Sequence, residues 1–199
     1  MLRIVAGRFR GRRLHGPEAA GLRPTADRMK ESLYNVLQGW FPGARVLDLF
    51  AGSGNLGLEA LSRGAARVVL VESGRRALQL IEQNVRLLGV EGEVEVVAGD
   101  ALGYLRSLPA GGFDLILADP PYDAGLEADT LAALSPAALA PGGCLVLQHR
   151  RNWSLEHPPA GWRMFRSKRF GDTVVDFLVR EEAGDGGSSG PGGALPGDL

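Results

Sequence analysis

Cysteine and long apolar runs are scarce in this sequence. The one cysteine, Cys144, excludes an intramolecular disulfide and speaks against a thiolate-rich metal site. Because Cys144 lies in an apolar, glycine-flanked stretch, we expect a small core residue rather than a nucleophile. No window approaches the roughly 18 apolar residues of a membrane span, and the arginine-rich N-terminus lacks the apolar region of a signal peptide. We therefore expect a cytoplasmic protein with no membrane partner.

A strong excess of charge of either sign is also missing, but the net charge of −1 hides an uneven distribution. Residues 1–44 hold 8 Arg/Lys against 3 Asp/Glu, residues 45–149 hold 7 against 13, and residues 150–182 hold 7 against 5. A phosphate backbone responds to local basic patches, so nucleic-acid binding by the N-terminal part stays open. The alternative is an ordinary solvated basic surface.

The first 43 residues are interpreted as a basic N-terminal extension that packs on the rest of the chain. Apolar and basic residues alternate in MLRIVAGRFRGRRLHGP around Gly7 and Gly11, which is typical of a short hairpin. From Thr25 to Trp40 apolar residues recur at helical spacing, and Thr25 can cap the start of this helix.

Residues 44–182 show a regular alternation of strand and helix patterns, which predicts an α/β fold with a mostly parallel, doubly wound sheet. Two strand patterns without a helix between them then predict an antiparallel hairpin at the edge of the sheet. Residues 183–199 are glycine-rich and are predicted to be a disordered tail. The expected strands cover 45–50, 66–72, 93–98, 113–118, 143–148, 162–171 and 172–181; the expected helices cover 55–64, 75–89, 101–108 and most of 126–139.

A glycine-rich loop follows the first expected strand and precedes a helix. Gly52 to Gly57 reads GxGxxG, a pattern that alone could bind NAD, FAD or S-adenosylmethionine. Asp48, still inside the strand, places a carboxylate beneath the loop. This suits a ligand with a cationic amino-acid end better than a pyrophosphate, which needs backbone donors and a helix N-terminus. The alternative is a tight turn that binds nothing.

Two further acidic residues follow the next strands. Glu72 has the spacing of a residue that holds ribose hydroxyls, although it could be a solvated residue at a strand end. Asp100 could accept a hydrogen bond from an adenine amine or simply cap the next helix. Both stay open on the sequence alone.

The motif Asp119-Pro120-Pro121-Tyr122 follows the fourth expected strand and has the composition of a site that binds an exocyclic amine. The Asp119 carboxylate and the Pro120 carbonyl can accept hydrogen bonds from an exocyclic amine, and the proline nitrogens offer no competing N–H. Tyr122 can stack on a base. Rate would then come from alignment of the amine with a methyl carbon and its leaving sulfur. The alternative is a plain Asp-Pro-Pro turn.

Taken together, RIVAGRFRGRRL, LRPTADRMKESLYNVL, VLDLFAGSGNLGLEALSRGA, DLILADPPY and FGDTVVDFLV resemble, in that order, the RsmD family of bacterial 16S rRNA guanine-N2 methyltransferases. The resemblance covers residues 1 to about 180 and implies a Rossmann-like class I methyltransferase. Where we would expect an acidic residue after the fifth strand, this chain has Gln148. The implied catalytic residues are Asp119, Pro120, Pro121 and Tyr122; the implied cofactor contacts are Asp48, Phe50, Gly52, Ser53, Gly54, Glu72, Ser73, Asp100, Ala101 and Asp119.

The resemblance also implies S-adenosylmethionine as cofactor, S-adenosylhomocysteine as product, no metal, and a monomer that acts on 16S rRNA in the small ribosomal subunit. Arginine carries nearly all the positive charge of the N-terminal part, and its planar group can contact phosphates in pairs or stack on bases. The expected RNA-binding residues are Arg8, Arg10, Arg12, Arg13, Arg23, Thr25 and Arg28.

Three other functions fit parts of the sequence. Methylation of adenine N6 in DNA also fits the Asp-Pro-Pro-Tyr motif, but no separate target-recognition segment is visible. An NAD-dependent oxidoreductase would need a proton-relay Tyr/Lys pair or His that the sequence does not place. A catalytically silent RNA-binding module would have no use for an intact methyl-transfer motif.

Overall fold

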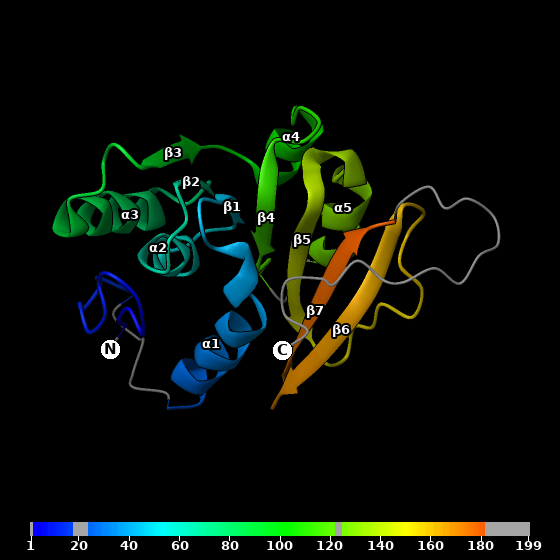
Figure 1. Cartoon of the computed structure of the whole chain (residues 1–199), viewed down its shortest axis with the longest axis horizontal. Coiled ribbons are helices and arrows are strands. Elements are labelled where there is room, and N and C mark those ends of the chain that lie inside the picture. The colour runs from blue at the N-terminus through cyan, green and yellow to red at the C-terminus, as the bar shows by residue number, and fades with distance from the viewer. Residues whose placement is uncertain (1, 18–23, 122–124, 182–199) are drawn as a thin grey trace.

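The computed structural model describes residues 2–17, 24–121 and 125–181, and in them it shows one seven-stranded sheet with helices on both faces (Figure 1). The strand order is β3-β2-β1-β4-β5-β7-β6. The strands are β1 (Arg45–Leu49), β2 (Arg67–Glu72), β3 (Val94–Ala98), β4 (Phe113–Ala118), β5 (Leu139–Arg150), β6 (Trp162–Phe170) and β7 (Thr173–Arg180). The helices are α1 (Pro24–Val36), α2 (Asn55–Ser62), α3 (Arg75–Leu88), α4 (Ala101–Arg106) and α5 (Leu126–Ala133), with short 3-10 turns η1 (Gln38–Trp40) and η2 (Pro136–Ala138).

The pairing of the strands confirms the predicted architecture. Strands β1 to β5 run parallel, and β7 lies antiparallel between β5 and β6. Strand β1 has β2 on one side and β4 on the other, so the strand order reverses there. In a sheet of this kind the crevice beyond the carboxyl ends of the strands at the reversal is where ligands bind.

Two hydrophobic cores lie on opposite faces of the sheet. Residues of the N-terminal extension, α1, α2 and α3 pack on one face, which we call the α1 face. Residues of α4 and α5 pack on the other, which we call the α4 face. Successive strand residues alternate between them: Val46 and Leu117 belong to the α1 core, whereas Leu47 and Ala118 belong to the α4 core.

Two predicted helices end at least four residues earlier than their patterns indicate. The helix expected over 25–40 ends at Val36 and continues as η1, because Gly39 weakens a helix and the Trp40 indole is drawn to β5, where Nε1 donates to the Gly142 carbonyl at 2.8 Å. The helix expected over most of 126–139 stops at Ala133, since Pro136 cannot continue it. Strand β5 accordingly begins at Leu139, four residues before its predicted start.

The N-terminal hairpin is present, but it is held by turns and one isolated bridge, between Arg3 and Arg13, rather than by two full strands. Figure 1 shows it beside α2 and α3, away from β6 and β7. It lies so close to α2 that a Cβ at Gly7, where φ is +79°, would meet the Ser62 carbonyl oxygen at 1.9 Å. Only glycine fits there. No helix in the described part of the chain could cross a membrane. The predicted tail, 183–199, lies outside the described residues.

Candidate functional site

A pocket of about 520 Å³ opens where β1 and β4 end, the place that the strand order indicates. Its wall combines the N-terminal extension, α1, the glycine-rich loop, α3 and the ends of β4 and β5. Five of the predicted site residues line it, namely Asp48, Phe50, Gly52, Ser53 and Asp119. The other lining residues are Leu2, Pro17, Met29, Lys30, Ala51, Asn55, Leu56, Arg76, Ala77, Leu80 and Gln148.

The glycine-rich loop is shaped by residues with positive φ and by close packing. Phe50 has φ 59°, a left-handed conformation that is rare outside glycine and that clusters at functional sites. The third glycine of the motif, Gly57, is constrained by packing instead: a Cβ there would lie 2.5 Å from Leu70 and 2.7 Å from Val68. The missing Cβ lets α2 lie directly on β2, and the Gly57 N–H donates to Asp48 Oδ2 at 2.8 Å.

Asp48, which is buried, and Asp119, which is partly buried, bring two carboxyl groups to the pocket, and no ion pair with either is found among the described residues. Burial raises the pKa of Asp48 well above its usual range, and the negative charge of Asp119 raises it further, against the hydrogen bond from Gly57. Burial also raises the pKa of Asp119 to about 6. A cationic ligand would relieve both costs, because an opposite charge favours the ionised carboxylates.

Glu72 and Asp100 are engaged with the backbone and do not line the pocket. The Glu72 carboxylate accepts from the N–H groups of Gly52 at 2.8 Å, Ser73 at 2.9 Å and Gly74 at 2.7 Å. It therefore ties the glycine-rich loop to the end of β2. Asp100 caps α4 by accepting from Gly103 N–H at 2.7 Å, the simpler of its two interpretations. Contacts of both with a cofactor stay predictions, as do those of Gly54, Ser73 and Ala101, which also lie outside the pocket wall.

The Asp-Pro-Pro-Tyr motif follows β4 directly, at the carboxyl end of the strand. Asp119 is partly buried and lines the pocket, Pro120 is buried and Pro121 is exposed. Tyr122 lies outside the described residues. The motif thus puts one carboxylate at the pocket and two residues without an N–H beside it.

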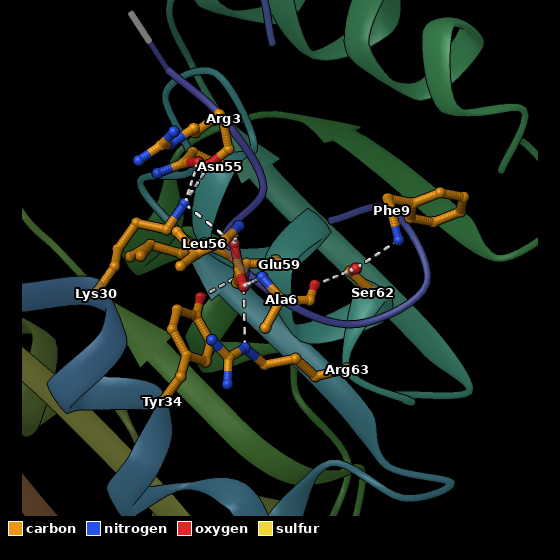
Figure 2. A network of polar contacts seen from close by, with 12 residues as sticks. Arg3, Ala6, Phe9, Lys30, Tyr34, Asn55, Leu56, Glu59, Ser62 and Arg63 are labelled. Carbon is orange, nitrogen blue, oxygen red and sulfur yellow. Dashed lines mark hydrogen bonds and ion pairs between the residues drawn. The ribbon is translucent and has the colours of Figure 1, made fainter. Parts of the chain in front are cut away.

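A buried ion network, which sequence reasoning missed, joins the pocket to the N-terminal extension (Figure 2). Lys30 Nζ lies 2.8 Å from Asn55 Oδ1 and 3.2 Å from Glu59 Oε2. Glu59, which is fully buried, also accepts from the Val5 and Ala6 N–H groups at 2.7 and 3.0 Å and from Arg63 Nε at 2.9 Å. The one available signal was a glutamate in the middle of the helix NLGLEALS, between leucine and alanine.

The N-terminal arginines differ in their contacts. Arg8 forms a two-pronged ion pair with Glu93 at 2.8 and 2.9 Å, and Arg12 donates to the Leu87 carbonyl at 2.9 Å. Arg10 and Arg13 are exposed. Arg23 lies outside the described residues, as do the side chains of Thr25 and Arg28, so their RNA contacts stay predictions.

Neither a metal site nor a reactive thiol is present in the described ranges. No group of three or more His, Cys, Asp or Glu residues within residues 2–17, 24–121 and 125–181 could hold a metal ion. Cys144 is fully buried in β5, and burial raises the pKa of its thiol. The prediction of a core cysteine is confirmed.

Comparisons with known proteins agree with this geometry. The family described as "Conserved hypothetical protein 95" matches residues 2–179. The ribosomal RNA small subunit methyltransferase D of Escherichia coli is 36% identical over 185 residues, 92% of each chain, and that of Haemophilus influenzae is 34% identical over 89% of this chain and 92% of its own. The solved Escherichia coli protein yhhF superposes with a TM-score of 0.79 at 35% identity, over 90% of this chain and 98% of that one.

A more distant solved structure shares the fold alone. It is the ribosomal protein L11 methylase of Lactobacillus delbrueckii, with 19% identity and a TM-score of 0.63 over 76% of this chain and 80% of that one. The chain belongs to the family whose model matches residues 2–179, which is the RsmD family of methyltransferases.

Proposed function

We propose that this protein transfers a methyl group from S-adenosylmethionine to the exocyclic N2 amine of a guanine in 16S rRNA of the small ribosomal subunit. It is an rRNA methyltransferase of the RsmD family. The observation that carries the finer proposal is the position of Asp119, at the end of β4 and in the same pocket as the glycine-rich loop.

The residues present fit S-adenosylmethionine, which would supply an electrophilic methyl group on a positively charged sulfur. Asp48 and the loop of Phe50, Gly52 and Ser53 would hold its cationic amino-acid end, since the buried carboxylate has no ion-pair partner among the described residues. Glu72 keeps the loop in place through Gly52 and has a lone pair left for a ribose hydroxyl. We propose that Gly54, Ser73, Asp100 and Ala101 complete the adenosine end.

Asp119 and Pro120 would orient the amine. The Asp119 carboxylate accepts one N–H and the Pro120 carbonyl the other, so that the nitrogen lone pair faces the methyl carbon. When the N–C bond forms and the S–C bond breaks, the amine would lose one proton, which the Asp119 carboxylate would accept. Because the pKa of Asp119 is raised to about 6, the group is ionised at neutral pH and is still basic enough for this role. Tyr122 would stack on the base.

We propose that residues 1–43 form a basic N-terminal extension and that residues 44–182 form the catalytic domain. The RNA would approach the pocket along the N-terminal extension. Leu2, Pro17, Met29 and Lys30 of this extension line the pocket, which supports a path from the extension to the methyl-transfer site. We propose that Arg8, Arg10, Arg12, Arg13, Arg23, Thr25 and Arg28 contact the RNA and that the enzyme acts as a monomer in the cytoplasm.

The test is transfer of tritiated methyl groups from S-adenosylmethionine to naked 16S rRNA, to small subunits lacking the modification, and to duplex DNA, followed by nucleoside analysis. We expect label in N2-methylguanosine from rRNA or small subunits and none in DNA. Label in N6-methyladenine of DNA would support the alternative acceptor. Cofactor binding without transfer to any of the three would contradict the proposed activity.

A further inference from the structure

Gln148 of β5 and Asp119, the first residue after β4, both line the pocket. Strands β4 and β5 are parallel and in register, with Ala118 opposite Leu147, so the next residues, Asp119 and Gln148, are neighbours. The preceding residue of β5 on the same face, Val146, belongs to the α1 core, and alternation therefore directs Gln148 to the α1 face. Both Asp119 and Gln148 line the pocket.

The Gln148 side chain is buried and incompletely bonded. It is 1% exposed, and its Oε1 has no hydrogen-bond partner among the described residues. A buried polar group without a partner lowers stability. The next residue, His149, points to the other face and has contacts at both ring nitrogens, with Asp176 Oδ2 at 3.0 Å and the Arg150 carbonyl at 2.9 Å. The missing partner is thus specific to the pocket side of β5.

The chemistry of a primary amide indicates what would fill this gap. An amide offers an acceptor and a donor side by side, in either orientation of its oxygen and nitrogen. Next to its N2 amine, guanine presents N1–H, a donor, and then O6, an acceptor. With N2 held at Asp119, the amide of Gln148 can accept from N1–H and donate to O6.

We propose that Gln148 is a positioning and specificity residue that binds the N1–H and O6 edge of the target guanine while Asp119 holds its N2 amine. The inference rests on the proposed function. A buried site that hydrogen-bonds a substrate rejects analogues that lack the matching groups, because its own polar atoms are then left unpaired. Adenine held by N6 at Asp119 would present only the N1 acceptor on its Watson–Crick edge, so guanine gains one hydrogen bond over adenine on that edge.

The experiment compares wild-type protein with Gln148→Leu and Gln148→Glu, using small subunits that lack the modification. Gln148→Leu should lower kcat/KM for the subunit about tenfold to a hundredfold. Its affinity for S-adenosylhomocysteine should stay within about twofold, and its melting temperature should be equal or higher, since an unpaired amide is replaced by an apolar group. Gln148→Glu keeps the acceptor for N1–H, so its kcat/KM should lie between the values of the wild-type protein and of Gln148→Leu. The control is Gln83→Leu, on the exposed side of α3.

Each outcome decides the inference. Unchanged kcat/KM in Gln148→Leu would overturn it, as would a matching loss of S-adenosylhomocysteine affinity, which would assign the residue to the cofactor. A lower melting temperature with activity falling in proportion to the folded fraction would assign it to the fold. If wild-type protein places no label in N2-methylguanosine, the proposed function itself fails, and this is seen before any variant is compared.

Discussion

Buried or partly buried carboxyl groups gather at two places in the described part of this molecule, and their partners differ. Glu59 is surrounded by Lys30, Arg63 and two backbone N–H groups, so its charge is balanced within the protein. Asp48 and Asp119 share a pocket, and burial raises the pKa of both. The comparison teaches how to separate structure from function here: a balanced buried charge holds elements together, whereas an unbalanced one marks a site for a cationic ligand.

The sharpest test of the unbalanced site is Asp119. Asp119→Ala should lower turnover about 10²- to 10³-fold, because the amine loses its acceptor. Affinity for S-adenosylhomocysteine should change by less than about threefold, since the proposed role of the residue is to hold the amine rather than the adenosine. Methyl-transfer assays and calorimetric titration give the two values. Weak cofactor binding with normal turnover at saturating cofactor would reject the assigned role.

The balanced site should respond in stability instead. Glu59→Gln leaves Lys30 and Arg63 without their buried counter-charge and should lower the free energy of unfolding by about 3–5 kcal/mol, measured by urea denaturation. The matched control is Glu82→Gln, which removes the exposed ion pair between Glu82 and Arg86 at 3.1 Å. This variant should change the free energy of unfolding by less than about 0.5 kcal/mol. Equal effects in the two variants would show that burial of the Glu59 network contributes nothing.

The raised pKa of Asp119, about 6, predicts a pH dependence of cofactor binding. In the free protein this carboxyl is protonated below that pH and ionised above it. The ratio of affinities for S-adenosylmethionine and S-adenosylhomocysteine isolates the positive sulfur, so it should rise from pH 5 to pH 7 by about threefold to tenfold and then level off. Asp119→Asn should flatten this rise. A ratio independent of pH in wild-type protein would place the Asp119 charge away from the sulfur.

The smallest effect concerns the RNA surface. Replacing Arg10 and Arg13 by alanine should weaken binding to 16S rRNA and reduce the dependence of log affinity on log salt by about 0.7–0.9 for each phosphate that the variant no longer neutralises. Arg8→Ala is the comparison within the same hairpin, because any RNA contact of Arg8 would have to compete with its ion pair to Glu93. Its slope should change less. An unchanged slope in the double variant would exclude the hairpin from the RNA interface.

The sequence predicted the elements that depend on local pattern. The seven strands, the parallel core and the edge hairpin were all correct, because period-two and helical patterns and their glycine punctuation are local signals. The two misjudged helix ends differ in kind: α5 stops before Pro136, a local signal, whereas the end of α1 depends on a distant residue. Helix α1 ends early because Trp40 binds β5, 102 residues away in sequence. No local pattern could predict that contact.

The candidate site was predicted in the same partial way. Asp48, Phe50, Gly52, Ser53 and Asp119 meet in one pocket because parallel strands bring their carboxyl ends to one edge. The pairing of Lys30 with Asn55 and Glu59 could not be foreseen, since it depends on how α1 crosses α2. The sequence singled out Gln148 only as a departure from an expected acidic residue. The register of β4 and β5 shows that Gln148 follows the residue paired with Ala118, at the same edge of the sheet as Asp119.

The N-terminal hairpin is fastened to the domain largely through its main chain. Val5 and Ala6 donate their N–H groups to Glu59, Arg8 donates its N–H to the Ser62 carbonyl, and both main-chain groups of His15 bond Asn84. Because these bonds use atoms that every residue except proline carries, most outward side chains of the hairpin can be exchanged without loosening its attachment. The hairpin is therefore an evolvable part of the molecule, in which exposed side chains and their charge can change residue by residue while the pocket that it borders stays the same.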